Sequence, residues 1–157
     1  LLHSRHGVSV VVDRRWRAYW QHRFVDPLAD AESLRMDDLG YITEIGSPVA
    51  DIEEIEAQYI GLMRFRGDGV DALRSARDNL RRVLESNLAS GSPDGAYMTD
   101  LLMEMIRMSW PIHAVPIDGG WLEIDTTEDY EAAAAMFADG SICQFYDAGA
   151  DLAQPTR

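Results

Sequence analysis

The chain has 157 residues, 46% of them hydrophobic and 26% charged, which is enough for one domain with a sizeable core. The formal net charge of −13 argues against a nucleic-acid partner, because phosphate binding requires a basic stripe. No apolar run is long enough to cross a bilayer, the N-terminus does not resemble a signal peptide, and the single cysteine permits no intramolecular disulfide. The expected location is therefore the cytoplasm.

The chain begins with a predicted strand and helix. Residues 7–13 are rich in β-branched apolar side chains, which favours an inner strand with neighbours on both sides. Asp13 is the predicted N-cap of the helix that follows. The apolar face of this helix carries four aromatic residues at spacings of three and four, Trp16, Tyr19, Trp20 and Phe24. We interpret this face as core packing rather than a base-stacking surface.

The middle and end of the chain alternate between strand and helix patterns, which predicts an α/β fold. A hairpin is predicted from two segments, 33–36 and 41–45, and a further strand at 58–65. Helical spacing from 70 to 84 and again from 99 to 110 brackets a Gly/Ser/Pro-rich loop at 87–96. The last predicted elements are strands at 111–117 and 121–125 and a helix at 127–138.

Two carboxylates lie at alternate positions near the end of the last predicted strand. Glu123 and Asp125 would project to the same side, since successive strand side chains point to opposite faces. Hard oxygen ligands of this kind suit Mg²⁺, so the pair is a candidate half of a metal site. The alternative is structural, because Asp125 and Glu128 also fit a capping box for the last helix.

Several common motifs are absent from the sequence. It contains no glycine-rich phosphate loop, no Cys/His cluster with zinc spacing and no serine nucleophile set between glycines. A reaction that is catalysed by positioning and charge neutralisation would require no nucleophilic side chain.

Five separated blocks, taken in order, resemble the nucleotidyltransferases of the sugar-phosphate type. The closest similarity is to the small cytidylyltransferases that activate phosphocholine or aminoethylphosphonate-like substrates. The blocks are Asp-Arg-Arg-Trp at 13–16, residues 23–32, Ile-Thr-Glu-Ile-Gly at 42–46, Gln-Tyr-Ile-Gly-Leu at 58–62 and Gly-Trp-Leu-Glu-Ile-Asp at 120–125.

The resemblance implies a Rossmann-like α/β/α sandwich with a mixed sheet. The family's glycine loop, a phosphate-binding basic residue and the first metal-binding aspartate have no counterpart here. Residues 1–138 therefore resemble the C-terminal portion of a nucleotidyltransferase domain that lacks its N-terminal strands, with 139–157 as a tail or extension. On this view the fragment by itself is inactive.

The resemblance also implies an activity and a set of site residues. The activity is Mg²⁺-dependent cytidylyl transfer from a nucleoside triphosphate, with CTP favoured, to a small phosphorylated or phosphonate acceptor, releasing pyrophosphate. Asp125 corresponds to a metal ligand, with Glu123 as its companion. Five residues correspond to the acceptor side: Glu44, Gln58, Tyr59, Thr99 and Asp100. Among these, Asp100 would pair with an ammonium head group and Tyr59 would face it.

One departure concerns phosphate binding. Many members of the family place a lysine after the Glu-Ile-Gly block, whereas this chain has Ser47 and Pro48 there. Arg64 is an alternative phosphate ligand, because a guanidinium binds phosphate with two parallel hydrogen bonds. The competing functional hypothesis is a non-catalytic binding or regulatory domain, which the missing glycine loop favours.

Overall fold

The computed structural model describes residues 1–86 and 96–146. The strands are β1 Val8–Asp13, β2 Leu34–Met36, β3 Ile42–Ile45, β4 Gln58–Phe65 and β5 His113–Ile117. The α-helices are α1 Trp16–Arg23, α2 Asp68–Ser86, α3 Met98–Arg107 and α4 Thr127–Asp139. Short 3₁₀ turns are Pro27–Ala29, Ile52–Glu54 and Ser141–Gln144.

A mixed three-stranded sheet forms the centre of the described fold, in the order β4-β1-β5. β1 runs antiparallel to β4 and parallel to β5. All six residues of β1 are buried, including Ser9 and Val11, which alternate with Val8, Val10 and Val12, so the strand is covered on both faces. The prediction of an inner strand with neighbours on both sides is confirmed, and so is the mixed α/β fold class.

The predicted hairpin is also confirmed, as the antiparallel pair β2-β3. Its turn is closed by Asp37, whose Oδ1 accepts hydrogen bonds from the backbone N–H groups of Leu39 and Tyr41 at 3.0 and 2.8 Å. An aspartate that bonds to the backbone two residues ahead is a usual turn former.

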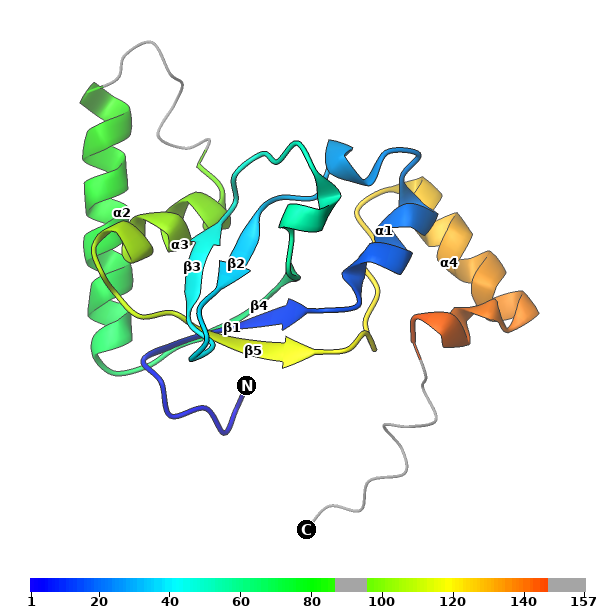
Figure 1. Cartoon of the computed structure of the whole chain (residues 1–157), viewed down its shortest axis with the longest axis horizontal. Helices are drawn as coiled ribbons and strands as arrows, with labels where there is room; N and C mark the ends of the chain where they lie inside the picture. The colour runs from blue at the N-terminus through cyan, green and yellow to red at the C-terminus, as the bar shows by residue number, and fades with distance from the viewer. Residues whose placement is uncertain (87–95, 147–157) are drawn as a thin grey trace.

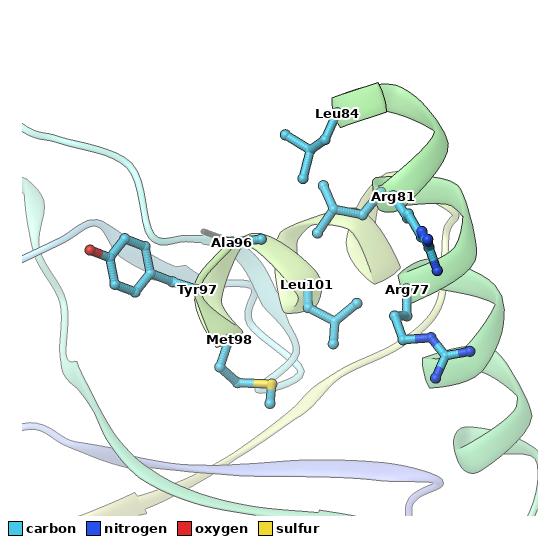
Figure 2. A pocket seen from close by; sticks show the side chains of 8 residues that line it. Arg77, Arg81, Leu84, Ala96, Tyr97, Met98 and Leu101 are labelled. Carbon is cyan, nitrogen blue, oxygen red and sulfur yellow. The ribbon is translucent and has the colours of Figure 1, made fainter. Parts of the chain in front are cut away.

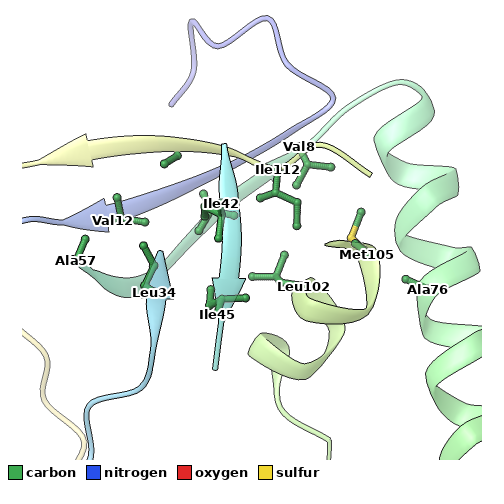
Figure 3. Packing of buried hydrophobic residues seen from close by; sticks show 12 residues of the cluster. Val8, Val12, Leu34, Ile42, Ile45, Ala57, Ala76, Leu102, Met105 and Ile112 are labelled. Atoms are coloured by element: carbon green, nitrogen blue, oxygen red, sulfur yellow. The ribbon is translucent and has the colours of Figure 1, made fainter. Parts of the chain in front are cut away.

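The helices divide between the two ends of the strands (Figure 1). Helices α2 and α3 lie at the end where β1 starts, and α1 and α4 lie beyond the arrowheads of β1 and β5. The larger core cluster packs Leu102 and Met105 of α3 and Ala76 of α2 against the valines of β1 and the isoleucines of β3 (Figure 3). The carboxyl ends of the parallel strands therefore point toward α1 and α4.

The aromatic face of α1 forms a second core cluster. Trp16, Tyr19 and Trp20 are each at most 5% exposed, and Phe24 is packed against them. Trp121, from the segment after β5, contacts the same cluster. The interpretation of this face as core packing is confirmed, since these aromatic side chains are buried and hold α1 near the carboxyl end of the sheet.

Two local predictions here are wrong. Residues 121–125 form no strand, and Asp13 is the last residue of β1 rather than the N-cap of α1, a position held by Arg15. The same contacts explain both errors. Asp13 is buried and accepts hydrogen bonds from the backbone N–H of Gly119 at 2.8 Å and the indole N–H of Trp121 at 3.0 Å. These bonds to Asp13 fix the segment after β5, and they substitute for the backbone hydrogen bonds that a strand would make with a neighbouring strand.

Gly46 sets the distance between the end of β3 and the start of α3. Its φ is +83°, and a Cβ built on it would lie 2.6 Å from the Cβ of Thr99. Because only glycine allows both this φ and this contact, α3 can begin directly against the hairpin. The predicted helix start at 99–100 is confirmed to within two residues.

The final described segment packs on α4. Ile142 is 8% exposed and forms a small cluster with Ala133 and Met136. The prediction of a tail from 139 onward covers 147–157, which lie outside the described residues, as does the predicted loop at 87–96 except for its last residue. None of the described helices is long and apolar enough to span a membrane.

Candidate functional site

A pocket of about 440 Å³ lies where α1, the hairpin, β4 and the start of α3 meet the segment after β5. Its carboxylates are Asp30, Glu32, Glu123 and Asp125, and its aromatic side chains are Trp20, Tyr59 and Tyr97. The other lining residues are the polar Ser33, Gln58 and Thr99 and the apolar Ile45 and Met98. Segments separated by up to 105 positions in the sequence therefore contribute to one cavity.

Negative charge dominates this pocket. Among the described residues that line it there are four carboxylates and no arginine or histidine. Burial raises the pKa of Glu32; a hydrogen bond from Thr99 acts against this, and the neighbouring charges of Asp100 and Asp30 act with it. A cationic ligand would relieve this repulsion, whereas a bare phosphate would increase it.

A second acidic wall of the pocket carries Glu123 and Asp125. Burial raises the pKa of Glu123, and the adjacent Asp125 adds to the effect, while Arg23 lowers it. The backbone of Glu123 is fixed by Tyr19, whose hydroxyl donates to its carbonyl oxygen at 2.8 Å and accepts from its N–H at 3.2 Å. A side chain of α1 thus sets where the first of the two carboxylates lies.

One arginine joins the carboxylates of this wall. The guanidinium of Arg23 donates to Glu123 Oε2 at 2.7 Å, to Asp125 Oδ2 at 2.9 Å and, through two nitrogens, to both oxygens of Asp129 at 3.0 Å. Its side chain is only 4% exposed. It also lies within 6 Å of three aromatic ring centroids, those of Tyr19, Trp20 and Phe24.

The start of α4 differs from the predicted capping box. The N-cap is Thr126, whose Oγ1 accepts from the N–H of Asp129 at 3.0 Å, and Asp129 Oδ2 accepts from the N–H of Thr126 at 3.1 Å. The predicted pair of Asp125 and Glu128 is therefore wrong. These bonds, together with those from Arg23, hold the pKa of Asp129 well below its usual range. Asp125 is consequently free of a capping role.

The donor set on this wall fits part of a magnesium site. Glu123 and Asp125 face one partner, Arg23, so the expectation that they project to the same side is confirmed. Mg²⁺ commonly takes one or two protein carboxylates and completes its shell with water and phosphate oxygens. Within the described residues no group of three or more His, Cys, Asp or Glu side chains is placed to hold a metal ion. The pair would therefore supply two ligands and no more.

Three of the five predicted acceptor-side residues also line the pocket. Gln58 is 6% exposed and donates to the carbonyl oxygen of Glu32 at 2.7 Å, so its side chain supports the acidic wall. Tyr59 is half-buried, and burial raises the pKa of its phenol. Thr99 lines the pocket from the first turn of α3.

The other two lie outside the lining. Asp100 accepts a hydrogen bond from the N–H of Tyr97 at 2.8 Å and so closes the first turn of α3. On the hairpin, Oε2 of Glu44 lies 3.6 Å from Nε of Arg35. Arg64, the alternative phosphate ligand, donates to the backbone carbonyls of residues 2 and 4, away from the pocket.

The sequence analysis missed three functional candidates, Arg23, Asp30 and Glu32. Asp30 and Glu32 repeat the alternate-carboxylate spacing of Glu123 and Asp125, but the block at 23–32 that contains them was used only for the family resemblance and gave no site residue. Arg23 follows Tyr19 and Trp20 at spacings of four and three, so it falls on the buried face of α1, where an arginine requires a partner.

A second, larger cavity of about 530 Å³ lies between α2 and α3 (Figure 2). Arg77 and Arg81 come from α2, and Tyr97 points away from them on the far side of the start of α3. Among the described residues, only Tyr97 and Met98 line both cavities, and none of the predicted site residues lines this one. The predicted site residues that line a cavity are therefore found in the smaller, acidic pocket.

The fold and the site define the chain as a Rossmann-like α/β protein, with its pocket near the carboxyl end of the parallel strands. Comparison with characterised proteins finds the CTP:phosphoglutamine cytidylyltransferase of Campylobacter jejuni, which is 38% identical over 132 residues. The match covers 83% of this chain and 51% of that protein.

This similarity supports a relationship to the cytidylyltransferase-type nucleotidyltransferases. It spans about half the length of the relative that it matches. No family model matches the chain.

Proposed function

We propose that the chain takes part in cytidylyl transfer from CTP to a small phosphorylated acceptor, and that the acidic pocket binds the acceptor end of the reaction. The name of the relative, a CTP:phosphoglutamine cytidylyltransferase, supports the reaction class. The observation that carries the proposal is the pocket lining: two pairs of carboxylates and three aromatic side chains share one cavity.

The two pairs would have different roles. Glu123 and Asp125 would hold Mg²⁺, which when bound offsets the charge that develops on the transferring phosphates. Asp30, whose Oδ2 accepts a hydrogen bond from the indole N–H of Trp20 at 2.9 Å, and Glu32 would hold a positively charged group of the acceptor, with Tyr59 in the same lining. An amino-acid acceptor of the phosphoglutamine kind would bring an α-ammonium group to this wall.

The reaction would be an in-line displacement. An oxygen of the acceptor phosphate attacks the α-phosphorus of CTP, a new P–O–P bond forms, the bond to the β-phosphate breaks, and pyrophosphate leaves with the electron pair. The residues of this chain would orient the acceptor and keep its cationic group away from the reacting oxygen. No side-chain nucleophile is needed.

The test is a pyrophosphate-release assay on the intact protein with CTP, MgCl₂ and a panel of phosphorylated amines and amino acids. Asp125→Asn should lower Mg²⁺-dependent turnover by about a hundredfold or more with the fold retained, since one metal ligand is lost. Glu32→Gln should raise KM for ammonium-bearing acceptors by about tenfold and leave kcat within about twofold.

Glu53→Gln is the matched control, because Glu53 is an exposed carboxylate paired with Arg17 away from the pocket. It should leave both constants unchanged. Full activity of Asp125→Asn would refute the metal assignment. CTP binding by the intact protein without pyrophosphate release from any acceptor would favour the non-catalytic alternative.

A further inference from the structure

Arg23 donates hydrogen bonds to two of the pocket carboxylates, and the proposed reaction gives it no role. It sits behind Glu123 and Asp125, which line the pocket, and it does not itself line it. Nearly complete burial of an arginine is costly, so its partners must be well placed around it. Four hydrogen bonds to three carboxylates meet this requirement.

The three carboxylates are held unequally. Asp129 receives two hydrogen bonds from Arg23, and its side chain is 11% exposed. Asp125 receives one, and its side chain is 60% exposed. Glu123 is intermediate, with one short bond of 2.7 Å and 31% exposure. Arg23 is therefore anchored on Asp129 and presents the other two carboxylates to the cavity.

Charge makes this arrangement receptive to a further cation. One guanidinium faces three carboxylates, so the cluster keeps an excess of negative charge on its exposed side. Without Arg23, the like charges of Glu123, Asp125 and Asp129 would drive these side chains apart. Arg23 thus keeps Glu123 and Asp125 together, and it neutralises their negative charge only in part.

We infer that Arg23 is a positioning residue that aligns Glu123 and Asp125 for a divalent cation, with Asp125 as the carboxylate that turns from Arg23 to the incoming ion. The inference rests on the proposed function, because it assumes that Asp125 is a metal ligand. During this exchange Arg23 stays on Asp129, whose two bonds and burial hold it against α4.

A purely structural cross-link between α1 and α4 would make a different prediction. If Arg23 only stabilised the fold, its loss would lower stability but leave the contribution of Asp125 to metal binding intact. If Arg23 aligns the pair, the effect of Asp125→Asn must shrink once Arg23 is replaced. This non-additivity separates the two roles.

The experiment is a double-mutant cycle on the intact protein with Arg23→Lys and Asp125→Asn. Lysine keeps the charge but lacks the planar fork that reaches three carboxylates. Binding of Mn²⁺ without substrates is measured by the electron paramagnetic resonance of the free ion, and kcat/KM is measured with MgCl₂. In the otherwise native protein, Asp125→Asn should weaken Mn²⁺ binding and lower kcat/KM by about tenfold or more.

In the Arg23→Lys background the same substitution should change either quantity by less than about threefold. In an Arg17→Lys background, which makes the same change at another ion-paired arginine of α1, it should keep its full effect. An equal effect of Asp125→Asn in the native and Arg23→Lys backgrounds would overturn the inference while leaving the proposed function standing. No effect of Asp125→Asn in either background would remove the metal role, and the inference with it.

Thermal unfolding accompanies each variant. If Arg23→Lys does not fold, Asp129→Asn takes its place, because it removes the anchor of Arg23 outside the pocket and should reduce the effect of Asp125→Asn in the same way. Retention of the full effect in that background would count against the inference.

Discussion

Asp13 connects the end of β1 to both segments that follow the parallel strands. It is 3% exposed, and its Oδ1 accepts from the N–H groups of Arg15 and Gly119 at 2.8 Å. Its Oδ2 accepts from the indole N–H of Trp121. A buried carboxylate that accepts three hydrogen bonds needs no counter-ion, because the donors meet its charge.

Asp13→Asn should destabilise the fold by about 1–3 kcal/mol, since an amide nitrogen would then face the indole N–H, donor against donor. Urea unfolding of the chain measures the change. In a Trp121→Phe background, where the indole donor is absent, the cost of Asp13→Asn should be smaller. Equal costs in both backgrounds would show that the Trp121 bond contributes nothing.

A pair of histidines lies at the other end of the sheet. His6 and His113 stack with ring centroids 3.9 Å apart and an interplanar angle of 8°, and Tyr41 meets both edge-on. Nδ1 of His113 is buried without a hydrogen-bond partner within the described residues. Burial lowers the pKa of His113 below its ordinary value of 6.5, and His6 lowers it further.

Stability should therefore fall as the pH drops from 7 to 5. Below pH 6.5 the unfolded chain binds a proton at His113 that the folded chain resists, so unfolding takes up protons and acid favours it. Thermal midpoints across this range measure the effect, and His113→Gln should flatten the profile. His3→Gln is the control, because His3 is exposed; an unchanged profile for His113→Gln would contradict the prediction.

At the scale of elements, the contact between the hairpin and α3 depends on one glycine. Gly46 and Gly61 both have positive φ, +83° and +78°, but only Gly46 lies against a neighbour, Thr99. A Cβ at Gly61 would meet nothing within 4 Å. The two positions therefore separate backbone strain from steric overlap.

Gly46→Ala should destabilise the fold by about 2–4 kcal/mol, the sum of a left-handed alanine and a clash with Thr99. Gly61→Ala should cost only the backbone strain, about 1–2 kcal/mol. Denaturant unfolding of both variants gives the difference. Equal losses would mean that α3 shifts freely, and Thr99 would then not be a fixed part of the pocket.

At the scale of the whole molecule, the pocket is assembled where the two core clusters meet. Ile45 belongs to the cluster that packs against α2 and α3, and Trp20 belongs to the aromatic cluster of α1. The two clusters lie toward opposite ends of the central strands, as the positions of α3 and α1 show (Figure 1). Part of the negative charge of the chain is thus gathered in one cavity, where four carboxylates line the pocket.

Local patterns were enough to predict most elements. β1, the hairpin, β4, α2 and α4 follow from the alternation of apolar side chains, helical spacing and turn residues, and each signal lies within about 20 residues of sequence. The resemblance of five blocks to the nucleotidyltransferases was likewise visible in the sequence, and the similarity to the Campylobacter jejuni enzyme supports it.

The failed predictions share a physical cause, which is hydrogen bonding between residues that lie far apart in the sequence. Residues 121–125 alternate like a strand, but the Asp13 carboxylate accepts a hydrogen bond from the indole of Trp121, 108 positions away, and no described strand pairs with the segment. Arg23 was hidden for the same reason, since its partners Glu123 and Asp125 lie 100 and 102 positions further on.

The sequence by itself thus determined the fold class, the family resemblance and the carboxylate pair, because hydrophobic period, turn chemistry and motif order are local properties. Only the tertiary structure decided that Asp30 and Glu32 share a cavity with that pair, that Asp100 and Glu44 lie outside it, and that Arg23 joins its members. Burial and charge pairing depend on which distant segments come into contact, and tertiary packing rather than local sequence pattern determines those contacts.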